Sequence, residues 1–253
     1  MYTLVYDGTF EGLLTAVFEI YERKLFHVKL IKGEWRASAL FEEVLEIITD
    51  ENRANRVLRG LRKRLSVACV QRLYIAHMAE MENEENAIVG FIRYAFDADR
   101  NIEEDYGNKY VMRISEIIKM VRREKHRMEA FVRFQKLKDE TFYSAVEPDF
   151  NVLPLLIRHF KDRYADQKWM IYDIKRRYGI YYDLETVSEV QFTFSGSAEN
   201  GNNIATAYDE SEPMYQLLWK QYFNSVNIPV RKNMKLHIQH MPKRYWKNLV
   251  EKK

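Results

Sequence analysis

The spacing of apolar residues changes near residue 130, and this change constrains the fold more than any other feature of the sequence. Before it, apolar side chains recur at helical spacing from Ser38 to about Arg100 and again from about Lys109 to His126. After it, "AFVRFQKL" and "TFYSAVEP" alternate like two strands joined by the polar break "KDE", with Phe131, Arg133 and Gln135 on one face of the first strand. Helical and strand-like regions that follow one another in this way indicate an α+β protein.

The region before the change is expected to hold one strand and several helices. "YTLVYDGT" alternates and ends in Asp-Gly, which is typical of a strand and a turn, and "FEGLLTAVFEIYERK" follows with helical spacing. At least three helices are predicted between Ser38 and Arg100, with "ENEEN" as the break before the third. The first of them would carry the apolar stripe Phe41, Val44, Leu45 and Ile48.

After the first hairpin the chain is expected to form a helix and a second hairpin. "VLPLLIRHFKDRY" has Pro154 in its first turn, and "KWMIYDIKRRYGIYYDL" holds two strand-like runs around a turn with Gly179. This order predicts an antiparallel α+β unit, followed by C-terminal helices of which the last begins at Pro242. We expect a strand and helical region over 1–86 and an α+β domain with a basic C-terminal helix over 87–253, or one continuous globular unit.

Charge is segregated along a chain whose formal net charge is only +3. Residues 228–253 hold eight basic residues and one acidic residue, and residues 119–138 hold eight and two. Much of the compensating acid lies in "EMENEEN" and "DADRNIEED". This segregation is typical of a surface that faces a polyanion, although a solvated basic helix would explain either segment alone.

Several classes of protein are excluded or disfavoured by what the sequence lacks. It contains none of the motifs G-x-G-x-x-G, G-x-x-x-x-G-K-[ST], H-E-x-x-H, C-x-x-C or G-x-S-x-G. The single cysteine, Cys69, rules out an internal disulfide and a self-contained iron–sulfur cluster. We therefore expect no metal and no cofactor. Because no signal peptide and no apolar run of about 18 residues is seen, a cytoplasmic protein without a membrane segment is expected.

Two carboxylates are the candidates for catalysis. Asp173 and Asp183 close successive tyrosine-rich strands, which are separated by a turn rich in Arg and Tyr. A carboxylate near guanidinium groups stays ionised and could act as a general base or orient a substrate. It could equally be half of a structural ion pair, and the sequence leaves both readings open.

Basic and aromatic residues are the candidates for binding nucleic acid, because Lys and Arg neutralise phosphates and aromatic rings stack on unpaired bases. In the C-terminal stretch "HMPKRYWKNL", either Tyr245 or Trp246 is expected to pack inward while charge stays outside. The candidates are Arg133, Lys136, Arg176, Arg177, Tyr178, Arg231, Lys243, Arg244 and Lys247.

Three long runs resemble a known family: "HRMEAFVRFQ", "EPDFNVLPLLIRHFKDRYADQKWMIYDIKRRYGIYYD" and "YQLLWKQYFNSVNIPVRKNMKLHIQHMPKRYWKNLVE". They are similar to a bacterial family associated with DNA metabolism and DNA repair, a domain of otherwise unknown function that is also found fused to uracil-DNA-glycosylase-like domains. The resemblance implies work on DNA beside a radical-SAM protein and offers no established catalytic residue. The recurring motif positions correspond here to Arg133, Trp169, Asp173, Arg177, Arg231, Asn233, Pro242, Arg244, Tyr245 and Trp246.

The resemblance and the charge pattern together favour a DNA-binding accessory protein in DNA repair or base modification, acting with a radical-SAM partner enzyme. One alternative is a DNA-processing enzyme, glycosylase-like or nuclease-like, that uses Asp173 or Asp183. The other is a protein-interaction scaffold whose basic surfaces contact an acidic partner.

Overall fold

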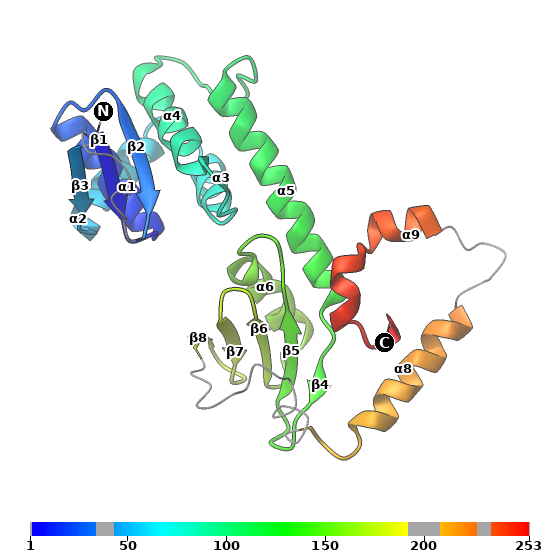
Figure 1. Ribbon diagram of the computed structural model, residues 1–253. Helices are drawn as coiled ribbons and strands as arrows, with labels where there is room; N and C mark the ends of the chain where they lie inside the picture. Colours follow the sequence, from blue (N-terminus) through cyan, green and yellow to red (C-terminus); the bar gives the residue numbers. More distant parts are fainter. Residues whose placement is uncertain (1, 34–42, 192–207, 227–233, 253) are drawn as a thin grey trace. The chain divides into compact units, whose positions relative to one another are not determined.

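The computed structural model describes residues 2–33, 43–191, 208–226 and 234–252. The chain divides into two compact units, residues 1–121 (unit 1) and 122–253 (unit 2) (Figure 1). Each unit holds a sheet with helices, so the α+β class predicted from the sequence is confirmed. The boundary near residue 86 stays a prediction. None of the described helices is long and apolar enough to cross a membrane.

Unit 1 contains a three-stranded, fully parallel sheet with the order β2-β1-β3. Its strands are β1 (Tyr2–Tyr6), β2 (Val28–Lys32) and β3 (Glu43–Ile47). The expected strand at the N-terminus is confirmed as β1. The helix expected around Val44 and Leu45 is wrong, because "EVLEI" pairs with β1 and places Leu45 beside Leu4 in the register.

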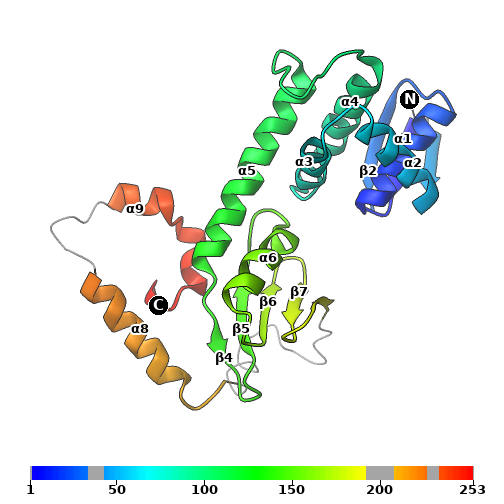
Figure 2. The same ribbon diagram turned by 180° about the vertical axis from the view of Figure 1, so that it is seen from behind.

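Among the described residues, the helices that belong wholly or partly to unit 1 are α1 (Phe10–Glu22), α2 (Glu51–Arg62), α3 (Val67–His77), α4 (Glu84–Asp97) and the first part of α5 (Lys109–Phe131). α1 and α2 pack side by side on one face of the sheet (Figures 1 and 2). Side-chain caps begin three of them, because Thr9, Asp50 and Ser66 accept backbone N–H groups of α1, α2 and α3.

Unit 2 contains a five-stranded sheet in sequence order and the helix α6 (Leu153–Arg163). The strands are β4 (Gln135–Lys136), β5 (Phe142–Val146), β6 (Trp169–Asp173), β7 (Tyr178–Tyr182) and β8 (Val187–Val190). The predicted hairpins β4–β5 and β6–β7 are antiparallel. However, β5 and β6 run parallel, so the expectation of an antiparallel unit is wrong for this pair, which α6 connects as a crossover.

The first predicted strand of unit 2 is much shorter than expected, because α5 continues to Phe131 and only Gln135 and Lys136 pair with β5. The proposed shared face of Phe131, Arg133 and Gln135 therefore does not exist. Phe134 instead packs into an aromatic core, with its ring edge-on to Phe160 of α6 at 5.7 Å between centroids. Trp169 of β6, fully buried, lies 6.0 Å from the same Phe160 ring.

The C-terminal part of unit 2 consists of short helices: α8 (Glu212–Val226), α9 (Met234–His240) and the 3₁₀ helices η2 (Lys243–Asn248) and η3 (Val250–Lys252). Pro242 is the N-cap of η2, so the predicted last element begins where expected but is a 3₁₀ helix. Of the two adjacent aromatic residues, Tyr245 is the one that is buried. Its ring lies 5.4 Å from that of Phe131 at the end of α5, which fixes η2 to this helix.

Candidate nucleic-acid interface

Three basic side chains from two distant segments of unit 2 converge on Asp149, which lies between β5 and α6. Lys175 Nζ and Arg176 Nη2 donate to the Asp149 carbonyl oxygen at 3.3 and 3.2 Å. Arg244 Nη2 lies 2.7 Å from the Asp149 carboxylate. The turn between β6 and β7 and the 3₁₀ helix η2 therefore meet at one residue.

Glu124 of α5 belongs to the same cluster. Its carboxylate is almost fully buried and accepts the Asp149 backbone N–H at 2.9 Å. Its other oxygen accepts the Tyr245 hydroxyl at 2.5 Å and Arg244 Nη2 at 3.0 Å. Burial and the neighbouring Glu124 raise the pKa of the Tyr245 hydroxyl, which therefore stays protonated and donates. Helix α5 and the 3₁₀ helix η2 thus meet at Glu124.

Asp173, a candidate for catalysis, is fully buried in this region. Its carboxylate accepts the Arg176 backbone N–H at 3.1 Å and Arg176 Nη1 at 2.8 Å, while the same guanidinium reaches the Pro148 carbonyl at 3.2 Å. These bonds hold the β6–β7 turn, in which Arg177 adopts a left-handed φ of 57°. Asp173 therefore positions a basic turn, which is the ion-pair reading that the sequence left open.

We call this cluster the Asp149 junction. Its contacts join three acids, Glu124, Asp149 and Asp173, to four bases, Arg127, Lys175, Arg176 and Arg244, and we include their neighbours in the sequence, the bases Arg177 and Lys243 and the pair Lys247 and Glu147. The bases outnumber the acids, and within the described part of the chain the exposed side chains of Arg177 and Lys243 have no acidic partner. Lys247 pairs with Glu147 but keeps 56% of its side chain exposed. The junction therefore presents surplus positive charge to solvent.

The remaining candidates from the second hairpin are not available for binding in the expected way. The Tyr178 ring is buried, and its hydroxyl donates to the Asn151 side chain, so the ring supports the turn. Asp183 accepts the backbone N–H groups of Glu185 and Thr186 at 2.9 and 2.7 Å, and these bonds hold its pKa below the ordinary value. Arg231 lies outside the described residues.

Asp173 and Asp183 also lie at opposite ends of the β6–β7 hairpin. The strand register pairs Asp173 with Tyr178, whereas Asp183 follows Tyr182, which pairs with Trp169. At about 3.3 Å per residue the five-residue strand separates the two carboxylates by more than 10 Å. They therefore cannot act together on one bond, and each would have to act alone.

Arg133 and Lys136 lie in a second place, a cleft of about 480 Å³ between the β4–β5 hairpin, α8 and η3. We call it the aromatic cleft. It is lined by Arg133, Phe134, Lys136, Phe142, Glu212, Tyr215, Gln216, Trp219 and Val250. Arg133 is held by Glu251 at 2.8 Å and stacks over Trp219 at 5.2 Å, and Lys136 lies 3.7 Å from Asp209. Unlike the junction, this cleft carries cations that are already compensated.

Sequence reasoning missed the residues that assemble these two places. Neither Asp149 nor Glu124 is among the candidates that the sequence offers. Nothing in the local pattern marked Trp219 or Glu212, because their partners are Glu251 and the backbone of Lys136, far away in the sequence. One usable signal is the cluster of Lys, Arg and Tyr around Gly179 in "DIKRRYGIYYD", which marks the turn at the junction.

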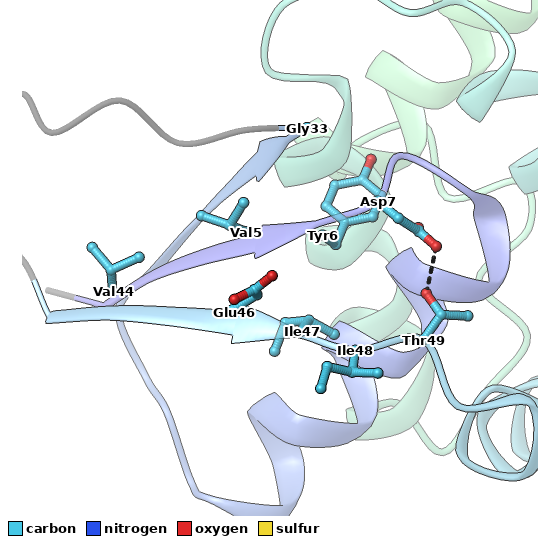
Figure 3. A pocket seen from close by; sticks show the side chains of 9 residues that line it. All are labelled: Val5, Tyr6, Asp7, Gly33, Val44, Glu46, Ile47, Ile48 and Thr49. Atoms are coloured by element: carbon cyan, nitrogen blue, oxygen red, sulfur yellow. Dashed lines mark hydrogen bonds between the residues drawn. The ribbon is translucent and has the colours of Figure 1, made fainter.

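Unit 1 holds a larger cleft of about 910 Å³ along β1 and β3, shown in Figure 3. Val5 and Val44 line its apolar part, and Glu46 and Asp7 bring two carboxylates. Asp7 accepts the Thr9 backbone N–H at 2.9 Å and the Thr49 hydroxyl at 2.7 Å. Burial raises the pKa of Asp7, but the hydrogen bonds from Thr49 and Thr9 lower it further, so this pKa lies below its ordinary value. This cleft is acidic and does not suit a polyanion.

The position of the Asp7 side chain depends on the absence of a β-carbon at Gly12. Replacing Gly12 by alanine should lower the free energy of unfolding by about 1–3 kcal/mol. A β-carbon at this position would lie 2.2 Å from Asp7 Oδ1 and 2.9 Å from Thr49 Oγ1, so the hydrogen bond between Asp7, which follows β1, and Thr49, two residues after β3, would break. Urea denaturation measures the change. Gly107→Ala is the control, because its added carbon finds its nearest neighbour at 3.4 Å. Equal stability of both variants would contradict this role of Gly12.

Comparison with known proteins shows a family and a distant structural similarity. The model of the family described as domain of unknown function DUF4130 matches residues 82–251. No curated protein matches the chain. The solved structure of the pGpG-specific phosphodiesterase PggH from Vibrio cholerae is similar over 89% of this chain and 99% of its own, at 11% identity and a TM-score of 0.33. A similarity this low carries no inference about activity.

Proposed function

The chain belongs to the DUF4130 family, and since that family is described only as a domain of unknown function, we propose a function from the site itself. We propose that the protein is a DNA-binding accessory protein in DNA repair or base modification. It holds DNA by its phosphates at the Asp149 junction while a partner enzyme performs the chemistry. The resemblance of the sequence names a radical-SAM protein as that partner.

One observation carries the proposal: the convergence at Asp149 of bases from the β6–β7 turn and from η2. Phosphate binding requires cations that are exposed, closely spaced and held in place. Arg177 and Lys243 are exposed, and each adjoins a residue, Arg176 or Arg244, that is fixed by buried carboxylates. The acids of the junction therefore serve to rigidify a surface whose outer charges remain positive.

The assignment of chemistry to a partner is supported by the state of the two candidate carboxylates. Asp173 is fully buried and paired with Arg176, and Asp183 is engaged with the backbone of its own turn. Each carboxylate thus accepts hydrogen bonds that stabilise its own turn.

Fluorescence anisotropy with a labelled DNA duplex and a labelled single strand tests the proposal. The double variant Arg177→Ala/Lys243→Ala should bind both DNAs more weakly, and the slope of log K against log salt should fall by about two, because two phosphate contacts are lost. Arg158→Ala is the matched control, since Arg158 is 94% exposed but lies near Asp162 on α6. No DNA binding at low salt, or an unchanged salt slope in the double variant, would refute the proposal.

A further inference from the structure

We propose that the aromatic cleft binds an unpaired nucleobase, and specifically one that carries an exocyclic amino group. This inference rests on the proposed function, because the base would belong to the strand whose phosphates meet the junction. It assigns a ligand class to a cleft that phosphate binding alone does not explain.

The walls of the cleft suit a flat aromatic ligand. Trp219 and Tyr215, one helical turn apart on α8, keep 37% and 57% of their surface exposed, and Phe134 and Phe142 line the side formed by the β4–β5 hairpin. A volume of about 480 Å³ lies within the usual range for small-molecule sites. Every nucleobase has a face that stacks on such rings, so stacking would supply most of the affinity.

Trp219 is oriented before any ligand arrives. Its indole N–H donates to Glu251 Oε2 at 2.9 Å, and the Arg133 guanidinium, bound to the same carboxylate, lies 5.2 Å from the ring centroid. A ring held in this way loses little conformational freedom on stacking. Arg133, predicted to contact nucleic acid, would thus act by positioning Trp219.

The charges of the cleft favour a base over a phosphate. Arg133 is neutralised by Glu251 and Lys136 lies 3.7 Å from Asp209, so neither presents an uncompensated charge. Glu212, which also lines the cleft, is a buried carboxylate. The negative charge of Glu212 would therefore repel a phosphate, whereas it would not repel a neutral ring.

The polar groups of the cleft favour a hydrogen-bond donor on the ligand. Glu212 accepts the Lys136 backbone N–H at 2.9 Å and the Gln216 amide N–H at 3.1 Å. Because the Gln216 amide nitrogen donates to Glu212, the amide oxygen of Gln216 remains as an acceptor beside the carboxylate. Adenine, cytosine and guanine carry an exocyclic amino group that such acceptors bind, and thymine does not.

The test compares single-stranded homopolymers with a duplex by fluorescence anisotropy. The intact protein should bind oligo(dC) and oligo(dA) several-fold more tightly than oligo(dT). Trp219→Leu should weaken binding of oligo(dC) by roughly 5- to 100-fold, the loss expected for one stacked base, and should leave duplex binding unchanged. Trp219→Phe should restore most of the affinity, which separates stacking from misfolding. Leu217→Ala, on α8 and 56% exposed but outside the cleft lining, is the control.

The outcomes separate this inference from the function on which it rests. If Arg177→Ala/Lys243→Ala weakens all DNA binding while Trp219→Leu changes nothing, the base site is wrong and the DNA-binding function stands. If oligo(dT) binds as tightly as oligo(dC), the amino-group preference is wrong. If the intact protein binds no DNA, the proposed function itself fails, and this inference fails with it.

Discussion

Replacing Glu124 by alanine should lower the free energy of unfolding by about 1–3 kcal/mol, the usual cost of leaving buried hydrogen-bond donors without a partner. The change leaves Arg244 without its buried carboxylate, Tyr245 without the acceptor of its hydroxyl, and the Asp149 N–H without a partner. Chemical denaturation followed by circular dichroism measures the loss.

The matched control for this change is Glu116→Ala on the same helix. Glu116 is 53% exposed and pairs only with Arg113, three residues earlier, so its removal should cost less than about 1 kcal/mol. A loss for Glu124→Ala no larger than that of the control would show that the junction is not a stabilising network. Because Glu124 holds Arg244, the variant should also weaken DNA binding at temperatures where it remains folded.

Replacing Glu84 by glutamine should stabilise the protein at pH 8 and remove a fall in stability that the unchanged protein shows as pH rises. Glu84 is 1% exposed, and burial raises its pKa to about 8. One of its oxygens accepts the Met81 backbone N–H at 2.7 Å, while the other has no partner among the described residues. Glutamine keeps the first bond and never has to ionise.

The sign of this pH dependence follows from whether Glu84 is protonated in the folded and in the unfolded state. Between the ordinary value of 4.5 and about 8, the unfolded chain has lost the Glu84 proton and the folded chain keeps it. The free energy of unfolding therefore falls with rising pH across this window, by at most about 1.4 kcal/mol per pH unit, and the contribution is gone above pH 8. Burial also lowers the pKa of His77 from its usual 6.5, an effect that acts below that pH.

Denaturation of both proteins between about pH 7.5 and 8.5 isolates the Glu84 effect, because this range lies about one unit or more above the ordinary histidine pKa of 6.5 and His77 is then almost entirely neutral in both states. The stability of Glu84→Gln should be nearly independent of pH in this range, and that of the unchanged protein should decline. Exposed Glu82→Gln serves as the control, since it makes the same chemical change at the surface of the protein. Parallel pH profiles for the unchanged protein and Glu84→Gln would contradict a buried, protonated carboxyl group.

The elements that the sequence predicted correctly are those whose signals are local. Apolar spacing over Lys109–His126 marked α5, Pro154 marked the first turn of α6, and the Gly-containing turn marked the β6–β7 hairpin. In each case the stabilising contacts lie within a few residues, so a short window of sequence contains the information.

The elements that it missed depend on distant partners. β2 and β3 become strands only by pairing in parallel with β1, from which each is separated by more than twenty residues. The stretch around Arg133 does not form the predicted strand, because α5 continues to Phe131, whose ring packs against that of Tyr245. Pairing and packing of this kind override local propensity.

The sequence by itself determined that basic residues gather in two segments and around one turn, and that aromatic residues accompany them. Only the tertiary structure decided which of these charges remain available. Arg244 finds Glu124 across 120 residues and Arg133 finds Glu251 across 118, whereas Arg177 and Lys243 stay exposed. The physical reason is that burial and the distance between opposite charges determine the strength of an ion pair, and both are set by folding rather than by position along the chain.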